Sequence, residues 1–248
     1  MNLRLLLLPI SFILTSVFYA QVSDNFTDGD FTQNPSWQGT NADFTVNASG
    51  ELQLNSLAAA TSYLSTPHLL ANLNDKEWQI KVRQTFSPSS SNYGRVYLTS
   101  DNANLSLCQN GYYLQFGETG STDAIRLFNL TNGVATQICA GPDGQISSTC
   151  NASVKVKRSA AGTWTLYADM AGGINYSLLA TGNDASNLIG THFGVLCTYT
   201  ISNATKYYYD NVYIGNEILD VTPPNLVSDT PISPVQIDVL FDELVTLP

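Results

Sequence analysis

The sequence predicts an all-β chain that folds as an antiparallel sandwich. Side chains alternate between apolar and polar with a period of two in most segments, as they do in half-buried strands. Turn-forming pairs such as Asn132-Gly133 and Gly172-Gly173 separate these segments at short intervals. Only residues 69–76 have a composition that suits a helix, and this stretch is short. About a dozen short strands with almost no helix indicate two packed antiparallel sheets.

The segment from Arg95 to Leu130 predicts three consecutive strands around which the rest of the chain is organised. Its middle part places Tyr112, Leu114 and Phe116 on one side of a strand and polar or aromatic residues on the other. One side of the sheet would then be buried, and the other would be free to hold a ligand. We expect the ligand-binding residues on that second side to be Arg95, Tyr97, Tyr113, Gln115 and Arg126.

Further strands are predicted before and after this segment. The clearest is 78–86, in which Trp78, Ile80, Val82 and Phe86 alternate with polar residues. The remaining strands are predicted at 43–46, 51–54, 62–65, 154–158, 164–169, 192–200 and 207–214.

The first twenty residues have the pattern of a signal peptide. Arg4 precedes an apolar run over 5–18, and polar Gln21 follows the expected cleavage point. The run is shorter than the roughly 18 to 20 residues that span a bilayer, and no later segment approaches that length. We therefore expect 1–20 to be removed and the mature chain not to span a membrane, a retained N-terminal anchor being the alternative.

The charge balance excludes one class of partner. Removal of the first twenty residues leaves nine basic and twenty acidic residues, a net charge of −11 (9 minus 20) on 228 residues (248 minus 20). This charge opposes binding to phosphate backbones, so nucleic acid is not an expected partner. Thirteen Tyr together with many Asn, Ser and Thr suit the hydrated surface of a secreted β-protein.

Four cysteines in an exported chain predict disulfides rather than a metal site, because there is no CxxC pair and there are two His. We expect Cys139 to pair with Cys150, since the ten residues between them include the turn at 141–144. Closing that loop would be worth about 3 kcal/mol in the chain-entropy model. Cys108 would then pair with Cys197.

The composition changes at Asp220, after the last predicted strand of the sandwich. Residues 220–245 contain a Pro-Pro linker and one alternating strand with Ile237, Val239 and Phe241 on one side. Thirty residues cannot close an independent sandwich, so we expect the chain to stop inside a second domain. The predicted organisation is a signal peptide at 1–20, a sandwich at 21–218, and a linker with the first strands of a truncated domain at 219–248.

Three segments resemble the concanavalin A-like (laminin G-like) jelly-roll superfamily, above all the versions that open large secreted surface proteins of Gram-negative bacteria. They are DNFTDGDFTQNPSWQG, GYYLQFGETGSTDAIRLF and YYDNVYIG, which together span 24–216. The resemblance implies two facing antiparallel sheets, one concave and often used for carbohydrate, although the fold does not imply that this copy binds sugar. Residues 220–245 are similar to the first strands of bacterial Ig-like repeats, which implies further domains of the same polypeptide.

The resemblance also implies a structural calcium site. The first and last strands pair in this superfamily, which would bring Asn25, Asp28 and Asp30 toward Asp210 and Asn211. Calcium requires several hard oxygen ligands in one small space, and these residues offer them. The alternative is that the Asp-Gly pairs only form turns. No other cofactor is expected.

Catalysis is the less favoured interpretation. Hydrolytic relatives with this fold carry a Glu-x-Asp-x-(x)-Glu strand, because two carboxylates must flank the glycosidic bond at a fixed separation. Glu-x-Asp does not occur in this sequence, and the remaining candidates are Glu118 with Asp123 or Asp169. A polysaccharide lyase would use Tyr113 as its base beside the two arginines of the same face. Tyrosines that cover a sheet and arginines paired with acids explain the same residues.

The leading hypothesis is a secreted, noncatalytic jelly-roll module of a multidomain cell-surface protein that binds carbohydrate or another extracellular ligand. Aromatic rings stack on pyranose rings, and amide and guanidinium groups hydrogen-bond to hydroxyls, so the expected face has suitable side chains. One alternative is a purely structural spacer or adhesin stalk domain. A second is a glycan-cleaving hydrolase or lyase.

Overall fold

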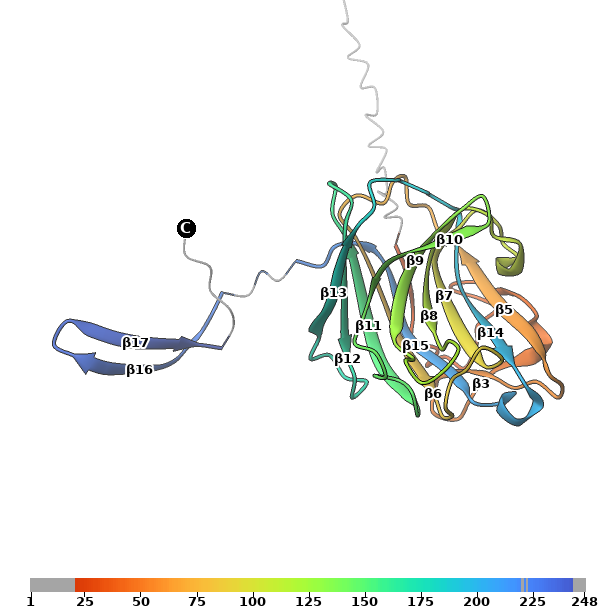
Figure 1. Cartoon of the computed structure of the whole chain (residues 1–248), viewed down its shortest axis with the longest axis horizontal. Coiled ribbons are helices and arrows are strands. Elements are labelled where there is room, and N and C mark those ends of the chain that lie inside the picture. The colour runs from red at the N-terminus through yellow and green to blue at the C-terminus, as the bar shows by residue number, and fades with distance from the viewer. Residues whose placement is uncertain (1–20, 220, 222, 243–248) are drawn as a thin grey trace, which may run out of the picture. The chain divides into compact units, whose positions relative to one another are not determined.

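The computed structural model describes residues 21–219, 221 and 223–242 (Figure 1). The predicted signal peptide, 1–20, lies outside the described residues. The chain divides into two compact units, Met1–Glu217 and Ile218–Pro248. The first unit contains two sheets and the second contains a single hairpin, and every strand pair in both is antiparallel.

The first unit is a sandwich whose two sheets lie face to face in Figure 1. Sheet A has eight strands in the order β13-β12-β11-β6-β15-β4-β3, with β1 also paired to β15. Its strands are β1 (Val22–Asp24), β3 (Phe44–Val46), β4 (Leu52–Leu54), β6 (Lys76–Gln84), β11 (Cys150–Arg158), β12 (Thr163–Asp169), β13 (Ser177–Asn183) and β15 (Tyr207–Asn216).

Sheet B has seven strands in the order β10-β9-β8-β7-β14-β5-β2. They are β2 (Gln38–Gly39), β5 (Ala60–Pro67), β7 (Tyr93–Ser100), β8 (Gly111–Phe116), β9 (Ile125–Thr131), β10 (Val134–Ala140) and β14 (His192–Tyr199). Three short 3-10 helices lie between strands, namely η1 (Asn41–Asp43), η2 (Leu105–Leu107) and η3 (Ile201–Asn203). The predicted all-β antiparallel sandwich is confirmed.

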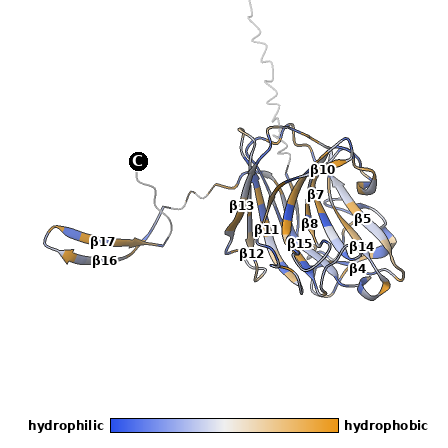
Figure 2. Ribbon diagram, viewed as in Figure 1, coloured by the Kyte–Doolittle hydropathy of each residue, from blue (hydrophilic) through white to orange (hydrophobic). Residues whose placement is uncertain are grey.

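The core fills the space between the two sheets. Hydrophobic and hydrophilic residues are interspersed along the strands (Figure 2), because alternate side chains point into the core. Trp78 and Trp164 stack with ring centroids 5.7 Å apart, and Tyr112 lies 4.4 Å from Trp164. Leu114 and Phe116 are also buried on this side, as their alternation predicts. Burial of an aliphatic or phenyl side chain contributes about 1.5–3 kcal/mol.

The turn at Asn132-Gly133 forms the predicted hairpin, between β9 and β10. Both residues have positive φ, 52° and 77°, as a two-residue turn of this kind requires.

Residues 69–76, by contrast, do not form a helix. Asn72 Oδ1 accepts the backbone N–H of Asn74 over 2.9 Å, and Asp75 has a φ of 52°, so the chain turns before β6 begins.

β2 and β13 are strands that the sequence does not predict. β2 has two residues, and β13 lacks a clear alternation. β13 packs against β10 across the edge of the sandwich. A Cβ added at Gly182 of β13 would lie 2.4 Å from the carbonyl oxygen of Ile138 in β10. This strand therefore depends on a close approach of two backbones that local periodicity does not reveal.

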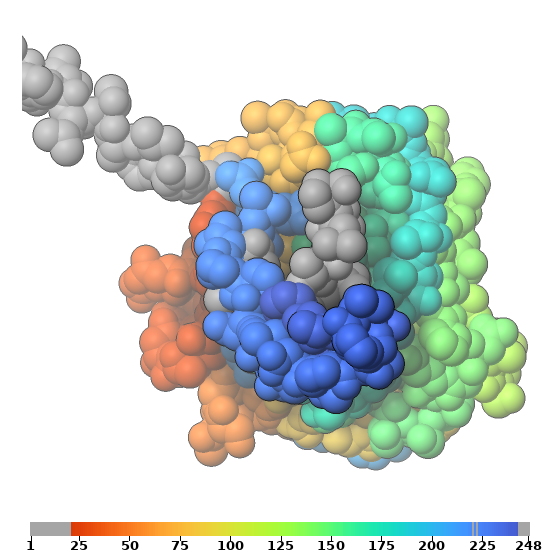
Figure 3. Space-filling model, turned by 90° about the vertical axis from the view of Figure 1, so that its left-hand side faces the viewer, coloured from red at the N-terminus to blue at the C-terminus, as the bar shows by residue number. Residues whose placement is uncertain are grey.

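The first and last strands of the sandwich pair, as the resemblance implies. Asp24 of β1 lies opposite Val212 of β15. The carboxylate of Asp24 also accepts the indole N–H of Trp37 over 2.8 Å, which ties the following loop to the core. The red segment in Figure 3, near the start of the described chain, stands out from the body of the sandwich.

The four cysteines are free thiols, so neither Cys139–Cys150 nor Cys108–Cys197 is a disulfide, and that prediction is corrected. Cys108 packs on the outer face of sheet B, whereas Cys197 points into the core, 3.2 Å from the Tyr209 hydroxyl. Cys139 belongs to sheet B and Cys150 to sheet A. The short loop suggested the pair Cys139–Cys150, but the fold places these two residues in different sheets. Elimination suggested Cys108–Cys197, but these two lie on opposite faces of sheet B.

The second unit contains the hairpin of β16 (Leu226–Ser233) and β17 (Gln236–Phe241). The predicted strand with Ile237, Val239 and Phe241 is β17, and all residues of β16 are exposed. An isolated two-stranded hairpin is marginally stable in water. The assignment of 219–248 to a truncated Ig-like domain stays a prediction.

Candidate functional site on the outer face of sheet B

The five predicted ligand-binding residues lie on the outer face of sheet B. They belong to two neighbouring rows of residues that run across β9, β8, β7 and β14. The rows are Arg126, Gln115, Arg95, Leu196 and Phe128, Tyr113, Tyr97, Gly194. Their role in binding stays a prediction, but the alternation along three strands placed them on one face.

The two tyrosines of this face are covered. Tyr97 and Tyr113 are each 2% exposed, and burial raises the pKa of both phenols. The segment 101–110, between β7 and β8, contributes Leu105 and Cys108 to the same cluster. We define the outer cluster as Tyr97, Leu105, Cys108, Tyr113, Leu130 and Leu196, with Tyr63, Tyr93 and Phe128 packed against it. Neither buried ring offers a face for stacking on a sugar.

A polar pocket lies beside the outer cluster, where β7 begins and β8 ends. This Arg95 pocket has a volume of about 240 Å³ and is lined by Ser90, Tyr93, Arg95, Gln115, Gly117, Glu118 and Thr119. The Arg95 guanidinium lies 5.3 Å from the ring centroid of Tyr93 and 4.6 Å from that of Tyr113. Its Nε donates to Oε1 of Gln115 over 3.1 Å. The guanidinium and the amide are thereby fixed side by side.

Arg126 contributes to this pocket indirectly. It forms ion pairs with Glu118 at 2.5 Å and with Asp143 at 2.9 Å. Glu118 lines the pocket, so Arg126 positions that carboxylate. The sequence allows two interpretations of Arg126, pairing with nearby acids or direct binding of a ligand. The ion pairs favour the first.

The carboxylates considered for catalysis are separated by the fold into two groups. Asp123 lies next to Glu118, because its Oδ1 accepts the Glu118 backbone N–H over 2.7 Å. Asp123 is 1% exposed, and burial raises its pKa. Asp169 lies on sheet A, where it accepts the backbone N–H groups of Ala171 and Asn175. Glu118 is thus the one of these three carboxylates that lines the pocket.

Tyr93 is a pocket residue that sequence reasoning missed. It is half-exposed and supplies the aromatic ring of the pocket, in place of Tyr97 and Tyr113. It precedes Arg95 by two residues, so the period that placed Arg95 and Tyr97 on one face also includes it. The limits assigned to the strand, rather than the pattern, excluded Tyr93.

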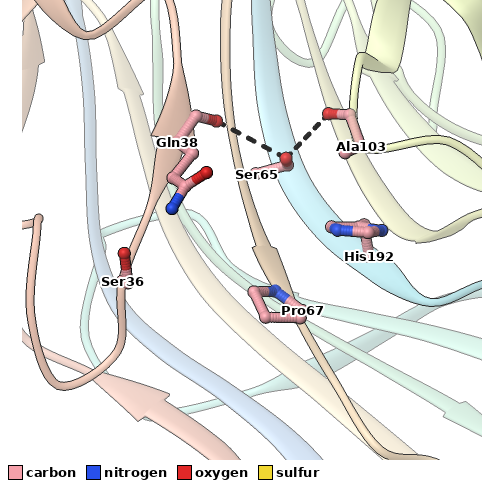
Figure 4. Close-up of a pocket in the computed structure, with 6 residues that line it drawn as sticks. All are labelled: Ser36, Gln38, Ser65, Pro67, Ala103 and His192. Atoms are coloured by element: carbon pink, nitrogen blue, oxygen red, sulfur yellow. Dashed lines mark hydrogen bonds between the residues drawn. The ribbon is translucent and has the colours of Figure 1, made fainter.

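A second hollow lies on the same face, over β2, β5 and β14. This His192 pocket has a volume of about 150 Å³ and is lined by Ser36, Gln38, Ser65, Pro67, Ala103 and His192 (Figure 4). The Ser65 hydroxyl donates to the carbonyl oxygens of Ala103 at 2.7 Å and Gln38 at 3.5 Å. A Cβ added at Gly194 would lie 2.8 Å from Leu105 Cδ1, so η2 sits directly on the sheet between the two hollows.

The outer face of sheet A has a different construction. Lys155 Nζ lies 4.4 Å from the ring centroid of Tyr176 and 5.3 Å from that of Tyr167. The Arg83 guanidinium lies 3.5 Å over the ring of Tyr208 and pairs with a carboxylate, Glu51. The lysine, the arginine and the three tyrosines are half-exposed. This face is covered by its own paired side chains.

The predicted calcium ligands do not form a ligand cluster. No group of three or more His, Cys, Asp or Glu suited to a metal ion occurs among the described residues. Asn25, Asp28 and Asp30 each accept a backbone N–H two residues ahead, and Asp210 accepts that of Asn211. As placed, these oxygens build turns, which is the alternative that the sequence leaves open.

The sequence matches no family model and no curated protein. Solved structures with a similar fold include the VIP36 exoplasmic/lumenal domain in a Ca2+/Man2-bound form, at 11% identity, covering 91% of this chain and 97% of that one, with a TM-score of 0.54. The legume lectin-like domain from Entamoeba histolytica is 12% identical, with coverages of 79% and 97% and a TM-score of 0.51. Lectin UEA-II complexed with galactose is 10% identical, with coverages of 79% and 97% and a TM-score of 0.52.

At these identities the likeness concerns the fold. In the described part of the chain, no helix combines the length and the apolar character that crossing a membrane demands. The predicted concanavalin A-like jelly-roll fold is confirmed, since the two antiparallel sheets are arranged as in these solved domains.

Proposed function

We propose that the sandwich is a carbohydrate-binding module and that the Arg95 pocket holds the glycan. The observation that carries the proposal is the fixed group of Arg95, Gln115 and Tyr93 at the mouth of one polar pocket. A guanidinium and an amide hydrogen-bond to neighbouring hydroxyls, and a half-exposed tyrosine ring stacks on the apolar face of a pyranose. Glu118 adds a charged acceptor for sugar hydroxyls.

The fold supports this proposal without identifying a ligand. Similar structures include proteins bound to mannose-containing ligands or to galactose, at sequence identities that show fold alone. The pocket is preformed by hydrogen bonds within the sheet, as sites for small ligands usually are, and its lining is mostly polar, which suits a ligand rich in hydroxyls. In this proposal the glycan is held at one end of the central strands β7 and β8 rather than by the buried tyrosines midway along them.

The wider setting is part of the proposal. The chain would be exported by residues 1–20 and act outside the cell, with the second unit leading into further domains of the same polypeptide. A structural calcium ion near the turns of Asp28 and Asp210 belongs to this proposal, and the chelator arm of the screen below tests it. The module would hold a glycan without cleaving it.

The test is a binding screen of the purified chain on a broad glycan and polysaccharide panel, with calcium and again with chelator. Arg95→Met should weaken binding at least tenfold, because it removes the charged hydrogen-bond donor and keeps the aliphatic stem. Arg83→Met is the matched control, since Arg83 also lies over a tyrosine ring but on sheet A. Melting temperatures are measured for every variant.

Thr119→Trp provides a second variant that fills the pocket from an exposed position. Equal loss of binding for Arg95→Met and Thr119→Trp, with Arg83→Met unaffected, supports the site. Absence of binding to every glycan of the panel would contradict the proposal and favour the spacer interpretation. Release of shortened glycans from any bound polysaccharide would contradict the noncatalytic part.

A further inference from the structure

The His192 pocket contains polar groups that the fold does not use. The Ser36 hydroxyl, the Gln38 side-chain amide and Nε2 of His192 form no hydrogen bond with any other described residue. Ser36 and Gln38 come from the segment that contains β2, and His192 comes from β14, so the groups approach one hollow from separate strands (Figure 4). Groups of this kind that converge on a cavity are what a small polar ligand requires.

The walls of the pocket are fixed by their own hydrogen bonds. Ser65 ties β2 and the segment 101–110 to β5 through the carbonyl oxygens of Gln38 and Ala103. The Thr191 hydroxyl and Nδ1 of His192 lie 2.9 Å apart, which orients the imidazole and leaves its other nitrogen for the pocket. The site is therefore formed before a ligand arrives, which reduces the entropy lost on binding.

The chemistry of the lining indicates an uncharged ligand. None of the six side chains is an acid, a lysine or an arginine, and burial lowers the pKa of His192, which favours its neutral form at pH 7. Hydroxyl, amide and neutral imidazole groups both donate and accept hydrogen bonds, as sugar hydroxyls do. Pro67, opposite His192 in the strand register, adds an exposed apolar ring.

The size of the pocket limits the ligand to a single ring. A cavity of about 150 Å³ accommodates a six-membered ring such as benzene. The Arg95 pocket is separated from this one by η2, where Leu105 covers Gly194. His192 also lies four residues along β14 from Leu196, the partner of Arg95, which is about 13 Å along the strand. The two hollows are thus separate sites.

We propose that the His192 pocket is a second carbohydrate site, which binds one terminal pyranose of an uncharged glycan through Ser36, Gln38 and His192. The ring packs against Pro67, and its hydroxyls exchange hydrogen bonds with the three polar side chains. This site is independent of the function proposed for the Arg95 pocket, and either can fail without the other.

The test uses the fact that the chain has two histidines. His192 lines the pocket, whereas His68 is 5% exposed and does not line it, although its backbone N–H donates to the carbonyl oxygen of Thr191 beside His192. Proton NMR would follow both imidazole signals while the full chain is titrated with methyl α-mannopyranoside, methyl β-galactopyranoside and methyl β-glucopyranoside. At least one of these probes should move the His192 signal to saturation, and by more than the signal of the neighbouring His68.

Gln38→Ala should weaken that binding about tenfold, the effect expected from loss of one or two hydrogen bonds. Gln33→Ala, an exposed glutamine outside the pocket, is the matched control, and both variants should keep the melting temperature. Arg95→Met should leave the His192 titration unchanged.

Three outcomes would overturn the inference. They are a His192 signal that no probe moves, equal responses of Gln38→Ala and Gln33→Ala, and loss of the titration in Arg95→Met. The last outcome would mean that the sugar occupies the Arg95 pocket and affects His192 from there.

Discussion

The outer faces of the two sheets both carry tyrosines, but they shield these rings from water in different ways. Sheet B covers its aromatic residues with the segment 101–110, which leaves Tyr97 and Tyr113 2% exposed. Sheet A leaves Tyr167, Tyr176 and Tyr208 half-exposed and places lysine or arginine side chains over their rings. The first face is stabilised by burial and the second by contacts at the surface.

This difference determines where pockets form. A covered face has margins, and both pockets described above lie at margins of the outer cluster, where the covering segment ends. The outer face of sheet A is covered by its own side chains, and its lysine and arginine groups already have partners. The pattern of coverage, rather than aromatic content alone, therefore determines which face of a sheet forms pockets.

The largest expected effect compares one tyrosine from each face. Tyr113→Ala should lower the free energy of unfolding by about 3–5 kcal/mol, because a large buried ring is lost and a cavity remains. Tyr176→Ala should lower it by less than about 1 kcal/mol, since a half-exposed ring over a lysine gives up mainly a cation–π contact. Urea unfolding of both variants measures the two values. Equal losses would show that the two faces are stabilised alike.

A smaller effect tests how closely β5 and η2 pack against Gly194 of β14. In Gly194→Ala, the new methyl group would lie 2.3 Å from the carbonyl oxygen of Leu64, a backbone atom that cannot easily move. We expect a loss of about 1–3 kcal/mol in thermal or urea unfolding. Gly141→Ala is the control, since the nearest atoms to its methyl group would be the side-chain ends Gln145 Oε1 at 3.0 Å and Leu179 Cδ1 at 3.3 Å, and its effect should be within about 0.5 kcal/mol. A neutral Gly194→Ala would indicate that both β5 and η2 can move away from Gly194 at little cost.

The smallest effect concerns the ion pair of Arg83 and Glu51 on sheet A. Burial acts to raise the pKa of Glu51, but hydrogen bonds from Arg83 and Asn47 outweigh it and lower the pKa below its usual value. A carboxyl whose folded pKa is lowered stabilises the fold above its unfolded pKa of about 4.5 and loses this contribution as the pH falls further. Glu51→Gln should therefore flatten the stability profile below about pH 4.5.

At pH 7 the same substitution should cost about 1 kcal/mol, because Glu51 is 8% exposed but Arg83 is partly exposed and the glutamine amide can still accept its hydrogen bond. Melting temperatures recorded from pH 3 to pH 8 for both proteins test this. If the two curves run parallel below pH 4.5, the pair does not stabilise the fold.

The sequence predicts the strands and their faces well where one side of a strand is buried. The alternation of Tyr112, Leu114 and Phe116 with Tyr113 and Gln115 in β8 is reproduced in the structure, because the core selects one parity along the strand. Local periodicity fails at β13, whose position depends on Gly182 meeting the backbone of a distant strand.

The candidate site is predictable only in part, for a related reason. Periodicity says which side chains share a face, but not whether a distant or neighbouring segment covers that face. Arg95 and Gln115 therefore reach the pocket as expected, while Tyr97 and Tyr113 are buried under Leu105. His192 and Gln38 escape sequence reasoning because three strands far apart in the chain bring them to one hollow.

The four unpaired cysteines are protected by burial. Burial raises the pKa of Cys139 to about 11 and that of Cys150 and Cys197 to about 12, so these sulfurs stay protonated and react slowly. Burial raises the pKa of Cys108 as well. Cys139, Cys150 and Cys197 lie in the core between the sheets, so their alkylation reports the opening of the core, whereas alkylation of Cys108 reports the lifting of the segment 101–110 from sheet B.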